Sequence, residues 1–330
     1  MKGDLTRLIE IIKRLPEKAV KELLIEAEIK KEECEKEEKE KVPECPHCEG
    51  ENVVKNGSGH GKQTYICRSC KKSFTITTKT IMENSHSGEA VWKEIIRDTI
   101  NGVGIDTTAE NLDMTHATVF NMRHKILYAL EAEQNQKPIQ LTGVCEADET
   151  YILESFKGKK LPEGFYRKAR KHGAVATKPG VSDEYVCICA AVVRGGNAMS
   201  AAVCKSQPTN EKIKQVFDGK LTDNTLIVCD GAKSYNTLEK NGGCTVIHTN
   251  DNIEGFKNIN SVNGYHSFIK ERNRGARGFA TKYLNRYNAL FSLVYNINDF
   301  FVDDIYRMLF DRKNRYNTIA VSQSQNLFMS

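Results

Sequence analysis

The spacing of apolar and polar residues divides the chain into a helical first part and a second part that mixes strands and helices. Apolar residues recur at helical intervals in 1–30, with a break at Pro16, and again from about 86 to 132. Short β-rich runs predict strands at Leu141–Leu153, Glu184–Arg194, Ala198–Cys204, Thr225–Asp230 and, more weakly, Thr245–His248. Helical patterns lie at 209–219, 232–241 and 263–311. This mixed order predicts an α/β or α+β core.

Two polar segments mark boundaries between these parts. Residues 30–42 are nearly all Lys and Glu, which predicts a solvated helix or linker, and 133–138 is interpreted as a linker. The expected organisation is a helical arm with a charged linker at 1–42, a cysteine-bearing module at 43–78, a helical segment at 86–132, an α/β domain at 141–311 and a loose tail at 312–330. An ordinary arm is the simpler interpretation of 1–42, and a partner-binding helix pair is the alternative.

Composition limits the class of protein. In 330 residues the formal net charge is only +5, which favours a nucleic-acid partner weakly, so the positions of the charges matter more than their sum. We find no run of about 18 apolar residues and no signal-peptide core after Met1, which predicts a protein without a membrane span. Eleven cysteines, four of them in two C-x2-C pairs, predict reduced thiols and metal ligands in the cytoplasm.

The two cysteine pairs, Cys45-Pro-His-Cys48 and Cys67-Arg-Ser-Cys70, stand 18 residues apart. Each pair lets two thiolates converge on one tetrahedral ion, and a hairpin between the pairs would bring all four together, which predicts a zinc ribbon. Four cysteine ligands leave no open position, so we expect a structural ion. Lysines along the module suit contacts with phosphate: Lys55, Lys62, Lys71 and Lys72. Ribbons also dock proteins, so both roles stay open.

The segment 86–132 contains two helices joined by a short turn at 113–115. The second helix interleaves polar with apolar residues, and among them Asn121 could reach bases while Arg123 and Lys125 would bind phosphates. This arrangement favours a DNA-reading helix-turn-helix, with an ordinary three-helix bundle as the alternative.

Two carboxylates occupy positions that suggest a ligand. Asp148 lies inside the apolar first strand, where an unpaired charge is costly. Asp230 ends the apolar run 226–229 and precedes Gly231, which places it at the tip of a buried strand, where α/β proteins keep ligands. Each aspartate alone could cap a helix, but two such acids in one domain favour a metal site.

A third element follows at 261–270, where helical geometry places Asn263, His266 and Lys270 on one face. Basic residues that suit DNA contacts come directly after it: Arg272, Arg274 and Arg277. A second basic segment lies after the first strand and interleaves aromatic residues with Lys168, Arg170 and Lys171. We expect it to form a flexible loop that grips DNA, with a solvated surface loop as the alternative.

The order of these motifs resembles that of the zinc-ribbon insertion-sequence transposases with a ribonuclease-H-like DD(E/N)K domain. The matching motifs are Asp-Glu-Thr at 148–150, Asp-Gly at 230–231, N-x2-H-x3-K at 263–270 and G-x-R-G-x7-R-Y at 275–287. The likeness covers 43–300, and the joint order of the short motifs makes it fairly specific. It implies an α/β multidomain protein: a ribonuclease-H-like mixed sheet with flanking helices, preceded by a zinc ribbon and a helix-turn-helix.

The resemblance also implies roles for single residues. Asp148, Asp230 and Asn263 would hold two Mg²⁺ or Mn²⁺ ions. Lys270 would contact a phosphate near the cleaved bond, and His266 matches the histidine of the asparagine-bearing subgroup.

The third metal ligand has a competing candidate, Glu254, in a run that also resembles the family's third motif. Seven residues beyond it stands Ser261 instead of a lysine, whereas the arginine-rich segment and the Arg-Tyr pair register with Asn263. We therefore rank Asn263 first. Its neutral amide can bind a hard cation but leaves the site one negative charge short of the plain DDE pattern, which would weaken metal binding.

These residue types suit the cutting and joining of DNA. Two divalent cations about 4 Å apart hold the attacking and leaving oxygens and lower the pKa of the attacking water. The freed 3′-OH then attacks target DNA. The sequence predicts a transposase that binds transposon ends and target DNA, as a dimer or larger assembly by analogy with the family. The alternatives are a DNA-binding regulator with a degenerate core, and a nuclease that cuts without joining.

Overall fold

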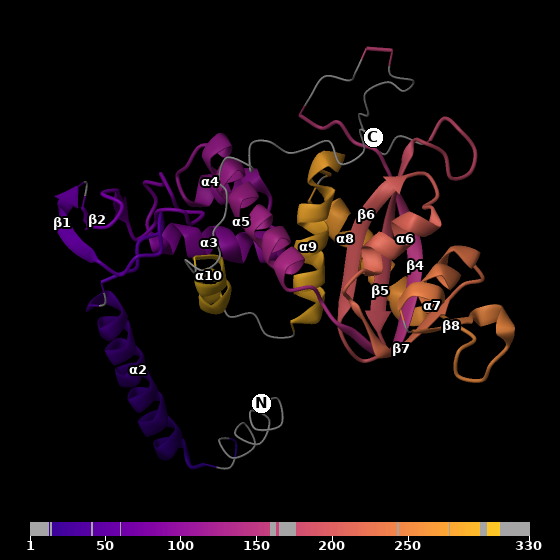
Figure 1. Ribbon diagram of the computed structural model, residues 1–330, viewed down its shortest axis with the longest axis horizontal. Coiled ribbons are helices and arrows are strands. Elements are labelled where there is room, and N and C mark those ends of the chain that lie inside the picture. Colours follow the sequence, from indigo (N-terminus) through magenta and orange to yellow (C-terminus); the bar gives the residue numbers. More distant parts are fainter. Residues whose placement is uncertain are drawn as a thin grey trace. The chain divides into compact units, whose positions relative to one another are not determined.

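The computed structural model describes residues 13, 15–40, 42–59, 61–158, 163–164, 176–242, 244–276, 278–297 and 302–310. They belong to two compact units, Met1–Thr78 and Lys79–Ser330 (Figure 1). The boundary falls where the predicted cysteine module ends, whereas the helical segment 86–132 shares a unit with the α/β core. Within the described ranges, every helix is too short or too polar to cross a lipid bilayer.

The first unit contains one long helix and a small antiparallel sheet. Helix α2 runs over Glu17–Glu40, so the Lys/Glu-rich segment continues the helix, as expected for residues of high helix propensity. Strands β1 (Val53–Gly59), β2 (Lys62–Cys67) and β3 (Ser73–Thr75) pair in that order. Tyr65 and Phe74 stack with ring centroids 5.7 Å apart and, with Val53 and two cysteines, form a small core.

The second unit is built on a five-stranded mixed sheet in the order β6-β5-β4-β7-β8. In chain order the strands are β4 (Leu141–Leu153), β5 (Tyr185–Val193), β6 (Ala198–Lys205), β7 (Leu221–Cys229) and β8 (Thr245–His248). The first three pair antiparallel, β7 runs parallel to β4, and β8 runs parallel to β7. All five predicted strands are present, and their order and directions are those of a ribonuclease-H-like sheet.

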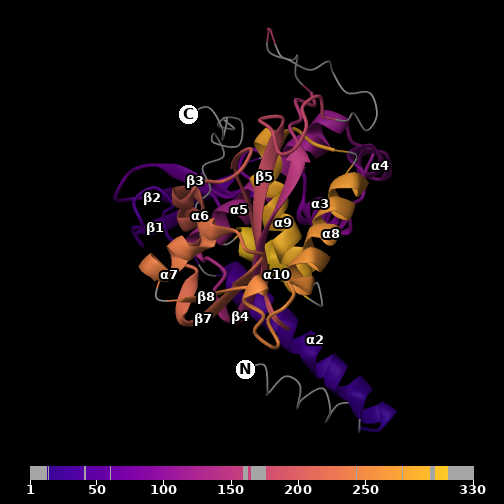
Figure 2. The same cartoon turned by 90° about the vertical axis from the view of Figure 1, so that its right-hand side faces the viewer.

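Helices cover both faces of this sheet (Figure 2). One face carries α8 (Asn260–Gly275) and α9 (Leu284–Asn296), and the other carries α6 (Asn210–Phe217) and α7 (Asn236–Gly242). Side chains of β5 alternate between the two cores, with Ile188 in the first and Cys189 in the second, because successive residues of a strand point to opposite faces.

The predicted helical stretch 263–311 is divided into several helices. Between α8 and α9 lies the short 3-10 helix η3 (Thr281–Tyr283), and α10 (Val302–Phe310) follows α9. Two further 3-10 helices border α7 and β8, η1 (Lys233–Tyr235) and η2 (Thr249–Asp251).

Three helices precede the sheet: α3 (Glu89–Asn101), α4 (Ile105–Asn111) and α5 (His116–Gln136). α5 packs along α9, and α3 packs against α10, where the rings of Trp92 and Phe310 lie 5.6 Å apart between centroids. These contacts place α3 and α5 in the same hydrophobic core as α8 and α9. The helical segment therefore belongs to the second unit.

Two asparagines of α9 pair with the outer edge of β6. Oδ1 of Asn285 accepts a hydrogen bond from the backbone N–H of Ala202 (2.7 Å), and Oδ1 of Asn296 accepts one from Ala198 (2.6 Å). The amide nitrogen of Asn296 also donates to the Ala198 carbonyl (2.9 Å). An edge strand otherwise presents unpaired backbone groups to other chains, so α9 both covers the sheet and occupies part of its edge, at Ala198 and Ala202.

Candidate active site and metal centres

Strand β4 carries three acidic side chains within four residues, and each has a different environment. Glu146 and Asp148 face α8, whereas Glu149 faces the opposite core, toward Tyr235. Glu146 is 1% exposed and engaged by hydrogen bonds from α8. Burial raises the pKa of Glu149 to about 7. Asp148 is thus the acid of β4 that can meet a ligand on the α8 side.

Asp148 on β4 lies near Asp230, which directly follows the adjacent parallel strand β7. The register pairs Glu146 with Val228, and continuing it by two residues places Asp148 beside Asp230, which directly follows β7. The Asp148 side chain points toward α8, because its Oδ2 lies 3.7 Å from Nδ1 of His266 on that helix. Burial, with the nearby Asp230 carboxylate, raises the pKa of Asp148 to about 6. The two carboxylates concentrate negative charge at the carboxyl end of β7.

One face of α8 carries the remaining predicted residues of this site. His266 is 5% exposed, and its Nδ1 lies 3.7 Å from Oδ2 of Asp148. Burial, and then the Lys270 ammonium group, lowers the pKa of His266 to about 4, so the imidazole is neutral at pH 7. The charge of Lys270 also opposes the rise in the pKa of Asp148. Asn263 is exposed one turn before His266.

The donor set fits a hard divalent cation. Asp148, Asp230 and Asn263 offer carboxylate and amide oxygens, the ligands that Mg²⁺ and Mn²⁺ prefer. Burial, and then the Asp230 carboxylate, raises the pKa of Asp148, and a cation bound at the two aspartates would oppose this rise by stabilising the charged form. Asp230 and Asn263 are exposed, so the site is open to a large substrate.

The competing third ligand, Glu254, lies outside α8. It is exposed in the loop before the helix, and Ser261, seven residues further on, donates hydrogen bonds to Glu146 from the start of α8. Asn263 shares its helix with His266 and Lys270, both of which interact with Asp148. This placement favours Asn263 over Glu254.

The four cysteines predicted to bind zinc come together in the first unit. The Sγ atoms of Cys45 and Cys70 are 3.6 Å apart, as are those of Cys48 and Cys67, and all four lie within 4.8 Å of one another. Thiolates bound tetrahedrally to zinc at about 2.3 Å would be about 3.8 Å apart, so the group fits this ion. Within the described ranges, it is the only group of three or more Cys, His, Asp or Glu ligands at such spacing.

Residues 140–296 match the family model of the ISXO2-like transposase domain, from just before β4 to the end of α9. This part of the chain is an ISXO2-like transposase domain. The transposase domain therefore includes Asp148, Asp230 and the whole of α8. Over 254 residues the chain is also 22% identical to a Halobacterium salinarum protein described as an uncharacterized protein in transposable element ISH50. That alignment covers 76% of this chain and 84% of the relative.

Solved structures of Mos1 are similar to the chain at low identity. The pre-cleavage Mos1 transpososome is 11% identical, with a TM-score of 0.22, over 64% of this chain and 75% of the Mos1 chain. The Mos1 strand transfer complex is 12% identical, with a TM-score of 0.26, over 64% and 71% of the two chains. At these TM-scores the likeness to Mos1 carries no argument. The ribonuclease-H-like topology is assigned from the strand order and pairing alone.

The helix pair before the transposase domain turns its basic residues inward. Arg123 is 6% exposed, and its guanidinium donates hydrogen bonds to the Val103 carbonyl (2.7 Å) and to Oγ1 of Thr108 (3.1 Å). This corrects the prediction that Arg123 contacts phosphate, because its donors serve the packing of α4 on α5. Lys125 is half-buried and donates to a backbone carbonyl at 3.3 Å. Asn121 is exposed and remains available to bases.

The predicted basic residues after α8 also differ in their surroundings. Arg272 donates to the Ile100 carbonyl (3.0 Å) and lies over the ring of Phe268, 5.2 Å from its centroid, so it joins α8 to α3. Its guanidinium is therefore only partly available to DNA. Arg274 is exposed at the end of α8. Four other predicted contacts lie outside the described residues: Lys168, Arg170, Lys171 and Arg277.

The base of the basic insertion is fixed on the transposase domain. Ser155, just after β4, donates its backbone N–H to Oγ1 of Thr281 (2.8 Å) and accepts one from Thr281 N–H (2.9 Å). Lys157 then donates to the Gly278 carbonyl at 2.8 Å. The insertion therefore leaves the sheet beside the segment that follows α8.

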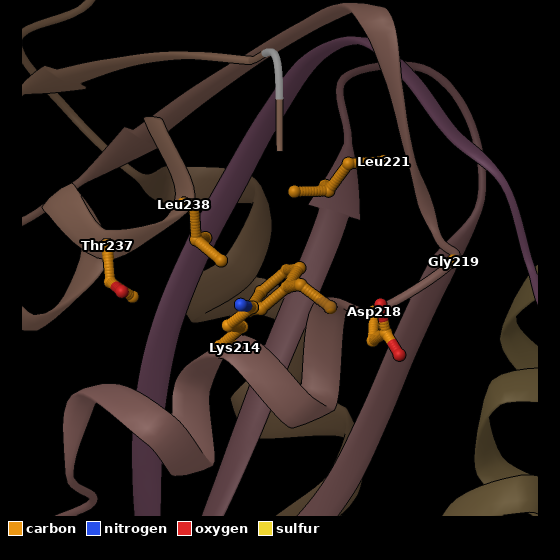
Figure 3. Close-up of a pocket in the computed structure, with 7 residues that line it drawn as sticks. Lys214, Asp218, Gly219, Leu221, Thr237 and Leu238 are labelled. Atoms are coloured by element: carbon orange, nitrogen blue, oxygen red, sulfur yellow. The ribbon is translucent and has the colours of Figure 1, made fainter. Parts of the chain in front are cut away.

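A shallow pocket of about 210 Å³ lies between α6 and α7 on the other face of the sheet (Figure 3). Its lining comprises Lys214, Phe217, Asp218, Gly219, Leu221, Thr237 and Leu238. The pocket lies on the α6–α7 face of the sheet, opposite α8, and neither Asp148 nor Asp230 lines it. The pocket is not part of the candidate active site.

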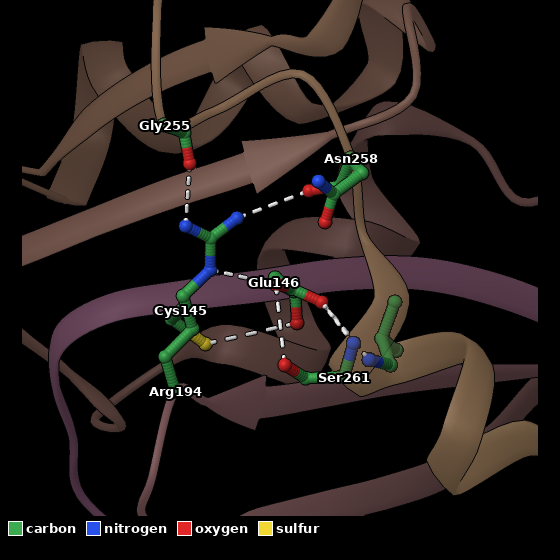
Figure 4. Close-up of polar contacts among 7 residues, drawn as sticks. Cys145, Glu146, Arg194, Gly255, Asn258 and Ser261 are labelled. Carbon is green, nitrogen blue, oxygen red and sulfur yellow. Dashed lines mark hydrogen bonds and ion pairs between the residues drawn. The ribbon is translucent and has the colours of Figure 1, made fainter.

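The sequence motifs do not include two charged residues of the transposase domain that lie beside the candidate site, Glu146 and Arg194. Nε of Arg194 lies 2.7 Å from Oε1 of Glu146, and together they hold the start of α8 (Figure 4). The one signal for Glu146 is its position in an apolar strand, two residues before Asp148 and on the same face. Arg194 comes at the end of its predicted strand, directly before Gly195-Gly196. An arginine at such a turn is also expected in solvent, so its position alone does not indicate a role.

Proposed function

We propose that the protein is a DNA transposase that cuts a phosphodiester bond at a transposon end and joins the freed 3′-OH to target DNA. The observation that carries the proposal is the proximity of the Asp148 and Asp230 carboxylates at neighbouring strands of an ISXO2-like transposase domain. The origin of the Halobacterium relative in a transposable element supports the same class of activity.

The residues around the carboxylate pair suit this chemistry. When bound, two divalent cations would activate the attacking water and stabilise the leaving oxygen. Asp148, Asp230 and Asn263 would hold them through oxygen ligands. Lys270 is exposed on the α8 face that interacts with Asp148, and it would donate to a phosphate oxygen beside the cleaved bond. His266 is neutral and sits behind Asp148, where it would restrict the orientation of that carboxylate.

DNA would be held by surfaces outside this site. We propose that the zinc ribbon at 43–78 and the exposed start of α5 contact the transposon end. Arg274 and the basic insertion after β4 would bind DNA near the cleavage site. In this organisation 1–42 is an arm and 141–311 the catalytic domain; the proposed tail, 312–330, lies outside the described residues. Because transposition joins two ends, we expect two or more copies on the DNA.

A nicking assay tests the proposal. Purified protein is incubated with Mg²⁺ or Mn²⁺ and a plasmid that carries the DNA flanking its own reading frame. Asp148→Ala and Asp230→Ala should abolish cleavage, because each removes a metal ligand, while binding to the same DNA survives. Full cleavage by either variant would contradict the proposal.

The alternative is a DNA-binding regulator derived from a transposase, and the neutral amide of Asn263 is the observation that favours it. A wild-type protein that binds the flanking DNA but never nicks it, with either cation, would support this alternative. A protein that nicks but yields no joined product in a strand-transfer assay would instead be a nuclease.

A further inference from the structure

Glu146 is a charged side chain that the proposed chemistry does not use, yet it is almost entirely buried. The residue is 1% exposed on the face of β4 that also carries Asp148. A buried carboxylate is costly unless hydrogen bonds and an opposite charge offset its loss of water. Both carboxylate oxygens have such partners, on α8 and on Arg194.

Helix α8 begins without a side-chain cap of its own, because Ile259 occupies the cap position. Instead, Oε2 of Glu146 accepts hydrogen bonds from the backbone N–H groups of Ser261 (2.6 Å) and Val262 (3.1 Å). Oε1 accepts a further bond from Oγ of Ser261 (3.2 Å). The carboxylate satisfies N–H groups that the helix leaves unpaired and places a negative charge at its positive end. The start of α8 is thereby tied to the central strand of the sheet.

Arg194 completes this junction (Figure 4). Its Nε donates to Glu146 at 2.7 Å, and its terminal nitrogens donate to the carbonyls of Gly255 (2.6 Å) and Asn258 (3.0 Å). The guanidinium also lies over the ring of Phe256, 5.6 Å from its centroid. One arginine therefore fixes both the buried carboxylate and the loop that leads into α8.

The junction lies between the two elements that carry the candidate metal ligands. Asp148 stands two residues after Glu146 on β4, and Asn263 directly follows Val262 on α8. We propose that Glu146 and Arg194 are positioning residues that hold Asn263 beside the Asp148–Asp230 pair, an inference that rests on the proposed function. Neither residue would touch the cation. They would act as the outer partners of metal ligands do, by fixing the ligands' geometry.

Binding of Mn²⁺ to the full-length, zinc-loaded protein without DNA tests this role, with free Mn²⁺ measured by electron paramagnetic resonance. Glu146→Gln preserves the size of the side chain but removes its charge. We expect the dissociation constant for Mn²⁺ to rise about tenfold, as for other losses of outer-shell partners. The backbone amides of Ser261 and Val262 should exchange faster with deuterium. Nicking should return at saturating Mn²⁺, which Asp148→Ala should not permit.

Glu154→Gln is the matched control. Glu154 directly follows β4, is 6% exposed and pairs with Lys205 at 2.8 Å, but this pair does not involve α8. Loss of the Glu154–Lys205 ion pair can lower the melting temperature as much as Glu146→Gln does. The affinity of the Glu154→Gln variant for Mn²⁺ should nevertheless stay at the wild-type value. Equal weakening of Mn²⁺ binding in both variants would assign the effect to lost stability and overturn the inference.

If Glu146→Gln does not fold, the Arg194→Lys variant tests the same positioning role. Lysine keeps the positive charge but lacks the fork that reaches three acceptors, so weaker Mn²⁺ binding is again expected. Wild-type affinity in either folded variant overturns the positioning role and leaves the proposed function intact. A wild-type protein that neither binds Mn²⁺ nor nicks DNA overturns the proposed function, and the inference with it.

Discussion

Asp148 holds a carboxylate where burial and a second carboxylate both disfavour its charge. The pKa of Asp148 is raised from 3.8 to about 6, so the folded state binds protons more tightly than the unfolded state does. Between these two values the stability of the cation-free protein falls as the pH rises, and above the higher value the loss is complete. The proposed metal site is therefore maintained at the expense of stability, and a bound cation would restore it.

Replacing Asp148 by asparagine should stabilise the cation-free protein. At pH 7.5 the free energy of unfolding should rise by on the order of 1 kcal/mol, allowing for solvent screening, which corresponds to about 2–4 °C. The gain should shrink as the pH is lowered toward 4, where Asp148 is protonated in the wild type. Thermal unfolding followed by fluorescence of Trp92, the only tryptophan, reports on the second unit.

Asp223→Asn is the control for this measurement, because Asp223 is an exposed acid on the neighbouring strand β7. Its melting temperature should stay near that of the wild type at both pH values. If the Asp148→Asn variant is less stable than the wild type at pH 7.5, the Asp148 carboxylate stabilises the cation-free fold. That result would contradict the prediction that its charge is destabilising.

At the scale of elements, we expect the small sheet of the first unit to depend on the predicted zinc ion more than on its core. Its hydrophobic cluster contains five buried residues, and two of them are the predicted zinc ligands Cys45 and Cys67. A core of this size does not offset the entropy of ordering the chain, so ion binding and folding of β1–β3 should be coupled. The second unit has two extensive cores of its own.

Cys48→Ser should therefore release zinc and unfold 43–78, while the melting of the second unit changes little. Zinc content by atomic spectroscopy and hydrogen–deuterium exchange along the chain measure the two effects together. Cys204→Ser alters a half-buried thiol of β6 and should keep one zinc ion per chain. Stoichiometric zinc in Cys48→Ser, with slow exchange in β1–β3, would rule out a four-cysteine site.

The elements predicted from the sequence are those whose signal is local. The five strands follow from apolar runs, and the cysteine group from its spacing. The direction of Arg123 could not be predicted, since it depends on the carbonyl of Val103, 20 residues away. The role of Glu146 depends on Ser261, 115 residues away. Contacts between distant segments leave no periodic trace in either partner, so only the fold reveals them.

At the scale of the whole molecule, the described helix pair at 105–136 lacks the exposed Lys and Arg residues with which a helix-turn-helix contacts phosphate. Residues 105–136 are all described, and their only Lys and Arg residues, Arg123 and Lys125, are buried and half-buried. The ribbon, by contrast, exposes several lysines: Lys55, Lys62, Lys71 and Lys72. If the exposed start of α5 contacts DNA, it does so through neutral side chains such as Asn121. Phosphate binding and base recognition should then reside in different parts of the chain.

This separation predicts two distinct effects on DNA binding. Lys55→Ala and Lys72→Ala should each lower the slope of log affinity against log salt by about 0.9, the value for one phosphate contact, with little change in sequence preference. Asn121→Ala should leave the slope unchanged and reduce the preference for the flanking DNA over random DNA, because a neutral amide releases no counterion. Titrations between low and physiological salt measure both. Lys214→Ala, at an exposed position of α6, should change neither quantity. A lower slope in Asn121→Ala would mean that α5 lies against the phosphate backbone, and unchanged slopes in both lysine variants would remove the ribbon from the DNA interface.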